Sequence, residues 1–345
     1  MGQDAMPVVR ETTFEEALAE TSGLRRHLLL GNGFSRAFSD SFAYQSLYSV
    51  APVFSPPVAR LFETYKPDFE AVLRTIADQR LAGIEDLAEL NRQEAEVKRA
   101  FAAAVARIHP ESALSVSAEQ SALCADFLRQ FHDAKVPLVQ RGKIFTTNYD
   151  LLLFWVIVAE SKQLKCYDAF VREPGNVDFR PWDPDKIPDL VYLHGALHIY
   201  RHQGRLTMLR YKEGARLVDQ IRERLARDEF PLLVAEGNSQ MKSARIRSNP
   251  YLRDALTSFR AALNHPNNVL FTFGHSLGAV DAHLLQAIGS RKLGAVYIGA
   301  FGGLRSEDGE RAVDWARNWG SQRAAAGRPG LRVAVYDSRI CHVWR

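Results

Sequence analysis

Short apolar runs, each followed by small or polar residues, recur along the chain between segments of helical periodicity. Runs of this length, rich in Val, Ile, Leu and Phe, are typical of buried strands. They predict strands at residues 26–30, 144–145, 190–193, 268–273, 295–299 and 331–336. Apolar spacing predicts helices between them, for example at residues 13–19 and 310–319. This alternation predicts an α/β fold with a doubly wound, mostly parallel, Rossmann-like sheet.

Polar or small residues that follow four of these strands are the candidate functional residues. Ligands of open α/β sheets bind beyond the carboxyl ends of the strands, so these positions are expected to meet at one crevice. The candidates are Gly31, Asn32, Gly33, Phe34 and Ser35; Thr147, Asn148 and Asp150; His194; and Gly274, His275, Ser276 and Asp281.

Each cluster has a chemical and a purely structural interpretation. Gly31 and Gly33 before a helix are typical of a phosphate-binding turn, but Arg36 stands where the dinucleotide fingerprint has its third glycine, so a plain tight turn is the default. Asn148 and Asp150 form either the floor of a site or a helix cap. His194 is placed to exchange a proton near neutral pH, or it is satisfied by the backbone of a turn.

The chain is predicted to form one domain, residues 1–345, with two mainly helical additions. A helical insertion is expected at about 38–140 and a second mainly helical segment at about 201–263. The mixed charges of the insertion indicate a solvated helix face. Within the second segment, the loop 236–239 before Lys242 could form a lid that brings a cation to a phosphate.

Composition excludes several classes of protein. The chain is 46% hydrophobic, and 44 Lys and Arg against 40 Asp and Glu leave a net charge of +4, which does not indicate a nucleic-acid or membrane partner. No apolar run approaches the length of a membrane span, and no leader pattern precedes the first strand. The widely separated Cys124, Cys166 and Cys341 form no metal-binding pair. We therefore expect a reducing cytoplasm and no metal.

One motif indicates a different chemistry. Residues 274–278 match G-x-S-x-G, the nucleophile elbow of α/β hydrolases, in the required context of strand, turn and helix. Ser276 would be the nucleophile of a serine esterase, and Asp337 and His342 would complete its triad. This alternative leaves the Gly31 turn and the Asn148 cluster unexplained.

Taken together, the four clusters resemble the ordered NAD-binding and catalytic motifs of the sirtuin-like superfamily. The matching segments are residues 31–35, 147–150, 194–195 and 274–276. The closer similarity is to bacterial sirtuin-like proteins that consume NAD in phage defence, and to a related uncharacterised bacterial family, in which the last motif continues to an aspartate, here Asp281. Sirtuin deacylases carry a zinc module built on two cysteine pairs, which this chain lacks.

The resemblance implies a sirtuin-like fold and an NAD glycohydrolase, with NAD as the substrate and nicotinamide and ADP-ribose as products. Asn148 would orient the ribose and the attacking water, His194 would accept a proton, and the other clustered residues would bind the cofactor. Anti-phage defence by NAD depletion is implied in the same way, with control by a homo-oligomer or a regulatory protein partner at the insertion. A serine esterase and a non-catalytic sensor of NAD or ADP-ribose derivatives remain as alternatives.

Overall fold

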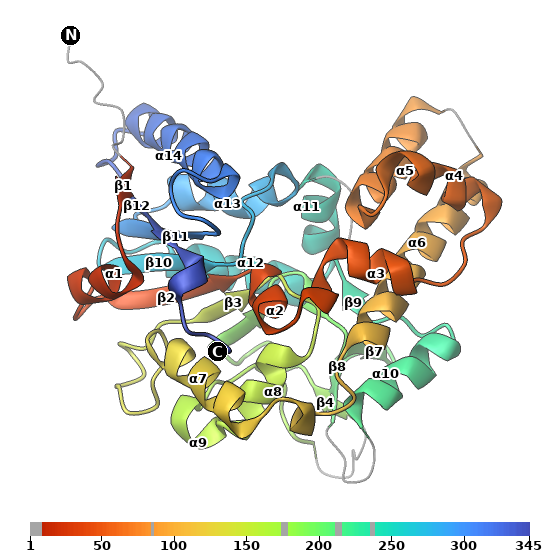
Figure 1. The fold of residues 1–345 in the computed structure, drawn as a ribbon, viewed down its shortest axis with the longest axis horizontal. Helices are drawn as coiled ribbons and strands as arrows, with labels where there is room; N and C mark the ends of the chain where they lie inside the picture. The colour runs from red at the N-terminus through yellow and green to blue at the C-terminus, as the bar shows by residue number, and fades with distance from the viewer. Residues whose placement is uncertain (1–8, 84–85, 174–178, 211–215, 235–238) are drawn as a thin grey trace.

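A parallel sheet forms the centre of the molecule (Figure 1). The computed structural model describes residues 9–83, 86–173, 179–210, 216–234 and 239–345. The sheet has seven strands in the order β1 (Arg10–Glu11), β12 (Arg332–Asp337), β11 (Ala295–Ala300), β10 (Asn268–Phe273), β2 (Arg25–Leu30), β3 (Ile144–Thr146) and β5 (Leu190–Tyr192). Every neighbouring pair is parallel. The predicted doubly wound, mostly parallel sheet is confirmed.

The strand order places a switch point between β2 and β10. From β2 the chain proceeds through β3 to β5 at one edge, and from β10 it proceeds through β11 to β12 near the other. β2 and β10 pair directly, with Leu30 opposite Phe273 at their carboxyl ends. Connections that leave in opposite directions separate the loops at these ends, and this opens a crevice for a ligand.

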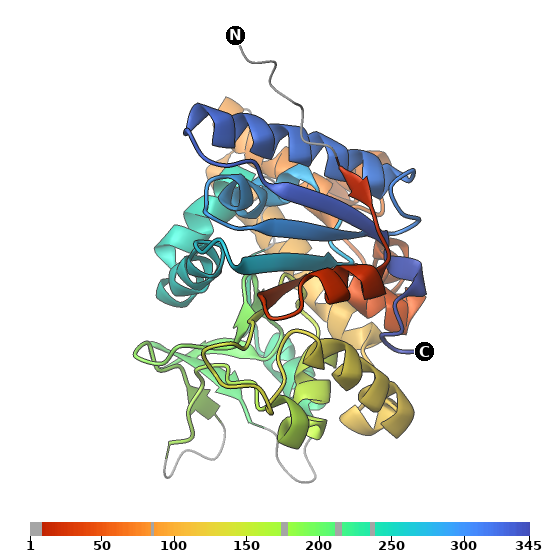
Figure 2. The same cartoon turned by 90° about the vertical axis from the view of Figure 1, so that its left-hand side faces the viewer.

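Helices cover both faces of the sheet (Figure 2). On one face, Phe14 of α1 (Phe14–Glu20) and Phe127 of α7 (Ala118–Arg129) pack against each other and against the β10 phenylalanines. A capping box of Thr13 and Glu16 begins α1. The other face carries α12 (Pro250–Ala262), α13 (Ala282–Gly289) and α14 (Glu307–Ala325). There Phe259 of α12 contacts Phe145 of β3. Because the strands are buried on both faces, each of them is a nearly continuous apolar run in the sequence.

The predicted insertion of residues 38–140 contains a group of helices beside the sheet (Figure 1). After the short α2 (Gly33–Phe38) come α3 (Tyr44–Val50), α4 (Pro56–Tyr65), α5 (Phe69–Ala82) and α6 (Leu87–Ile108). Stacked and tilted aromatic rings, among them Tyr48, Phe54, Phe62 and Phe69, hold these helices together. Helix α7, although inside the predicted range, covers the sheet itself.

The segment predicted as mainly helical at 201–263 contains strands as well. A small antiparallel sheet joins β4 (Phe179–Pro181), β8 (Arg205–Leu209) and β7 (Ile199–His202), and β6 (Gly195–Ala196) pairs with β9 (Leu232–Leu233). Helices α10 (Leu217–Ala226) and α11 (Ser239–Ser248) follow, and α12 belongs to the sheet-covering layer. Glu236, Gly237 and Asn238 of the proposed lid lie outside the described residues. Helices α8 (Leu152–Ala159) and α9 (Ser161–Leu164) pack against α7.

Candidate functional site

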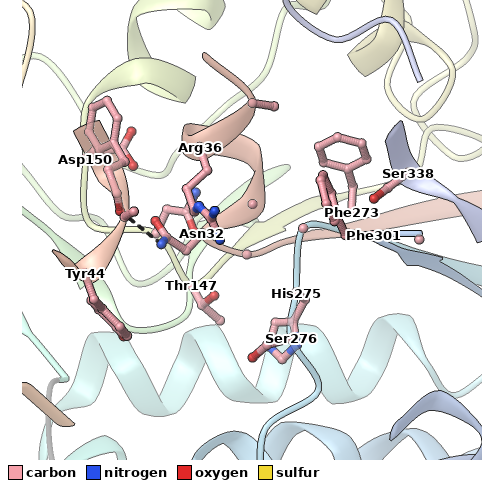
Figure 3. A pocket seen from close by; sticks show the side chains of 18 of the residues that line it. Asn32, Arg36, Tyr44, Thr147, Asp150, Phe273, His275, Ser276, Phe301 and Ser338 are labelled. Carbon is pink, nitrogen blue, oxygen red and sulfur yellow. Dashed lines mark hydrogen bonds between the residues drawn. The ribbon is translucent and has the colours of Figure 1, made fainter. Parts of the chain in front are cut away.

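A cavity of about 890 Å³ lies at the switch point, beyond the carboxyl ends of β2 and β10. This volume is at the upper end of the range of small-molecule sites. The cavity walls come from the loops after the central strands, from helices of the insertion, from α11 and from residues 338–345. Figure 3 shows part of the lining, with Asn32 and Arg36 from the start of α2 and His275 and Ser276 from the loop after β10.

Most of the candidate residues line this cavity. They are Gly31, Asn32, Gly33, Thr147, Asn148, Asp150, His194, Gly274, His275, Ser276 and Asp281. Phe34 and Ser35, which were expected to bind a cofactor, do not line the cavity. The ring of Phe34 is buried against Trp344 with a centroid distance of 5.0 Å, and Trp344 Nε1 donates to the Phe34 carbonyl. Ser35 is fully buried and points to Asp150, because the aromatic side of α2 faces the core.

Ser35 orients the Asn148 side chain. Its hydroxyl donates to Asp150 Oδ2 at 2.5 Å and accepts from Asn148 Nδ2 at 2.9 Å. A hydroxyl has one proton to give, so the bond to Asp150 requires the amide nitrogen, and not the amide oxygen, to face Ser35. Asn148 Oδ1 makes no hydrogen bond within the described residues and is left to the cavity. The chain of bonds thus presents a fixed acceptor to a ligand.

Both carboxylate oxygens of Asp150 accept hydrogen bonds. Its Oδ1 accepts from Leu152 N at 2.9 Å at the first residue of α8, although the N-cap position itself is Leu151, which makes no side-chain capping bond. Its Oδ2 holds Ser35 and, through Ser35, Asn148. Burial raises the pKa of Asp150, although the hydrogen bonds from Ser35 and Leu152 oppose that shift.

The glycine turn at residues 31–33 packs directly against the turn at Gly274. Gly31 N donates to the Phe273 carbonyl, Gly33 N to the Gly274 carbonyl, and Phe34 N to the Gly31 carbonyl. These three N–H groups are therefore not free for a phosphate. A Cβ on Gly33 would stand 2.5 Å from Gly274 Cα. The glycines allow two backbone turns to touch beneath the cavity.

We expect Gly274→Ala to destabilise the protein strongly. Gly274 has φ +65°, and a Cβ there would lie 2.5 Å from Phe34 N. Left-handed strain and backbone overlap together should lower the free energy of unfolding by about 2–4 kcal/mol. Gly278→Ala is the matched control, since its nearest neighbour would be Ser276 Oγ at 3.4 Å and its φ is not left-handed. Urea unfolding of both variants measures the difference, and equal stabilities would show that the two turns are not tightly packed.

A buried charged cluster forms another part of the cavity wall. Lys242 Nζ of α11 lies 2.9 Å from Glu70 Oε1 and 3.1 Å from Asp281 Oδ1, and the lysine is 1% exposed. Asp281 Oδ2 lies 3.4 Å from His275 Nε2, and Asp281 Oδ1 lies 3.8 Å from His194 Nε2. Asp281 was expected to contact a cofactor, but its carboxylate is engaged by protein groups.

Burial and neighbouring charges shift the pKa values of His194, His283 and Asp281. Burial lowers the pKa of His194 well below its usual value, and the nearby Asp281 only partly opposes this. Burial also lowers the pKa of His283 to about 4. For Asp281, burial acts to raise the pKa, but Lys242 and the adjacent histidines outweigh it and hold the pKa well below the usual range. His194 is therefore a neutral base near pH 7.

Sequence reasoning missed several residues of the cavity. Glu70 and Tyr44 come from the insertion, and Lys242 was considered only as part of a lid. Arg36 was noted only as a missing glycine, yet it lines the cavity, with its guanidinium next to Asn32 in Figure 3. Glu70 and Lys242 are 172 residues apart in the sequence and meet through a tertiary contact, so no local sequence pattern identifies them as partners.

The residues of the esterase alternative do not form a triad. Asp337 binds Arg339, with Nη2 2.6 Å from Oδ2, and His342 Nδ1 lies 3.1 Å from the Arg345 carbonyl. No hydrogen bond joins Ser276 Oγ to a histidine in the described part of the chain. The left-handed residues of this loop are Gly274, with φ +65°, and Leu277, with φ +54°, and a 3₁₀ turn at residues 279–281 separates Ser276 from α13. A nucleophile elbow would place the serine itself at the sharp turn.

Within the described ranges, every helix is too short or too polar to cross a lipid bilayer.

Comparisons with known proteins relate the chain to a protein family and to a solved structure. Residues 28–344 match the family model described as a domain of unknown function, DUF4917. Among curated proteins there is no match. A crystal structure of a Sir2 homolog in complex with NAD is similar at 13% identity, over 92% of this chain and 98% of the other, with a TM-score of 0.37. A TM-score of this size does not relate one site to another.

Proposed function

The chain belongs to the DUF4917 family of unknown function, and we propose from its cavity that it is an NAD glycohydrolase, which cleaves NAD to nicotinamide and ADP-ribose. The observation that carries the proposal is the pairing of Asn148 and His194 at one cavity. Asn148 offers a fixed amide oxygen, and His194 offers a neutral imidazole from the end of the strand next but one to β2. The order of the four motifs, which resembles that of sirtuin-like proteins, supports the same substrate.

Cleavage requires one bond to break and one to form at the ribose. The bond between the ribose anomeric carbon and the nicotinamide nitrogen breaks, and its electron pair leaves with nicotinamide. Positive charge develops on the sugar, as in glycoside hydrolysis. Water then attacks the anomeric carbon and gives up a proton, so the products are nicotinamide, ADP-ribose and one proton.

The chain supplies positioning and proton transfer for these steps. Asn148 Oδ1 accepts a hydrogen bond from a ribose hydroxyl or from the water and fixes the angle of attack. His194 accepts the proton that the water loses. Since Gly31 N, Gly33 N and Phe34 N are occupied, Arg36 is the group we assign to the diphosphate, because a guanidinium forms paired bonds with phosphate oxygens.

The pH profile should reflect the depressed pKa of His194. A base acts when it is unprotonated, and burial holds the pKa of His194 well below its ordinary value of 6.5. The acid limb of kcat/KM for nicotinamide release should therefore fall below pH 6.5, and the rate should not decline between pH 7.5 and 6.5. An acid limb centred at or above pH 6.5 in the wild-type chain would contradict this environment.

Substitutions at two residues distinguish the proposal from its alternatives. Asn148→Ala should lower nicotinamide release at least about 100-fold while Ser276→Ala weakens it much less, and a serine esterase would show the reverse on an ester substrate. A sensor would bind NAD, seen as a raised melting temperature, without releasing nicotinamide. Anti-phage defence and control by a partner or by self-assembly remain proposals that follow from the resemblance.

A further inference from the structure

Three side chains beside the cavity converge in a way that the cleavage steps do not require. One ligand atom each from His194, Asp281 and His283 lies within 4.8 Å of the others. His194 Nε2 is 3.3 Å from His283 Nε2 and 3.8 Å from Asp281 Oδ1. His283, at the start of α13, is 6% exposed and takes no part in the proposed reaction.

The distance between the two imidazole nitrogens is that of a metal chelate. Nitrogen ligands bind zinc at about 2.0–2.1 Å, and tetrahedral angles then place two of them about 3.3 Å apart. The same distance also fits a single hydrogen bond between the rings, in which His283 or His194 carries the proton. Asp281 Oδ1, 3.8 Å from His194 Nε2, favours the metal site over the hydrogen bond, since this carboxylate would be a third ligand beside the two histidines.

The chemistry of the three donors selects a borderline metal ion. Two imidazoles and one carboxylate match the protein ligands of open zinc sites, in which the fourth position is left for water or substrate. His194 and Asp281 line the cavity, so that position faces it. The hydrogen bond from Lys242 to Asp281 is the kind of outer contact that orients a ligating carboxylate, and Glu70 balances the lysine charge.

We propose that His194, Asp281 and His283 form a binding site for Zn²⁺. The ion takes one nitrogen of each histidine and one oxygen of Asp281, with its open position toward the cavity. A consequence, which rests on the proposed function, is that zinc inhibits cleavage, because the His194 imidazole is then held by the metal and not available to the attacking water.

Zinc affinity of the chelator-treated full chain tests the site without any activity assay. Zn²⁺ is titrated in competition with a chromophoric chelator, and Co²⁺ absorption in the visible range reports the coordination geometry. The wild-type chain should bind one ion, and His283→Ala should bind it at least about 100-fold more weakly, since even losing an outer contact costs up to that much. His265→Ala is the matched control because it removes an exposed histidine remote from the cavity, and its affinity should match the wild type.

A second variant and a second readout keep the outcome clear. If His283→Ala does not fold, His283→Asn retains a polar group of smaller size and should show the same loss. Equal zinc affinity in wild type and both His283 variants, or an equal loss in His265→Ala, overturns the site. Zinc bound tightly by a chain that never cleaves NAD would leave the metal site in place and refute the proposed function alone.

Discussion

Asn148→Ala should lower kcat for nicotinamide release by about 100- to 1,000-fold, which is the usual cost of removing one preorganised group from a reacting centre. The amide is fixed by Ser35, which is itself fixed by Asp150, so the orientation of Asn148 does not have to be reached during the reaction. Initial rates at saturating NAD measure the loss. The melting temperature of Asn148→Ala should change only slightly, since the side chain is at the cavity wall.

Two further variants separate orientation from the mere presence of an amide. Asn32→Ala removes another amide that lines the cavity but is held through the Phe42 carbonyl, and it should cost less than about tenfold in kcat. Ser35→Ala keeps Asn148 but removes the group that orients it, and kcat should fall more than KM rises. Equal effects of Asn32→Ala and Asn148→Ala would contradict the role given to Asn148.

Lys242→Met should be the most destabilising of the substitutions in the charged cluster. The ammonium is buried between Glu70 and Asp281, so its loss leaves two carboxylates without a counter-charge. Breaking a buried pair from one side costs about 3–5 kcal/mol, far more than the net contribution of such a pair. Chemical unfolding at pH 7 measures the change in the free energy of unfolding.

A control and a rescue make this prediction specific. Lys143→Met removes a half-buried ammonium that donates to the Ser258 hydroxyl and forms no ion pair within the described residues, so it should cost less than about 1 kcal/mol. Adding Glu70→Gln to Lys242→Met removes one of the stranded charges and should restore part of the stability. A Lys242→Met protein as stable as Lys143→Met would show that the lysine does not compensate the two acids.

The fold was predictable because buried parallel strands leave a strong local signal. β10, at Asn268–Phe273, begins and ends where its apolar run does, and it is covered on both faces. The hairpin of β7 and β8 was not predicted, because its strands are short and partly exposed and lie among charged residues. The aromatic packing among helices α3, α4, α5 and α6 was likewise not predicted, because the spacing of apolar residues within one helix does not show which other helix it contacts.

The candidate site was predictable in position but not in the direction of its side chains. Strand ends must meet at one edge, so Gly31, Asn148, His194 and Gly274 were expected together. Whether Ser35 faces the cavity depends on the rotation of the short α2, which is set by Phe34 and Trp344. The partnership of Lys242 with Glu70 is a tertiary contact, and no local pattern encodes it.

The most direct test of the account is nicotinamide release from NAD by the purified chain, with Asn148→Ala and His194→Ala measured beside it over a range of protein concentrations. The account predicts nicotinamide and ADP-ribose in equal amounts, with turnover lowered at least about 100-fold in both variants. A rate that rises faster than the protein concentration would indicate control by self-assembly. An intact NAD pool, together with a melting temperature that NAD does not raise, would contradict the account.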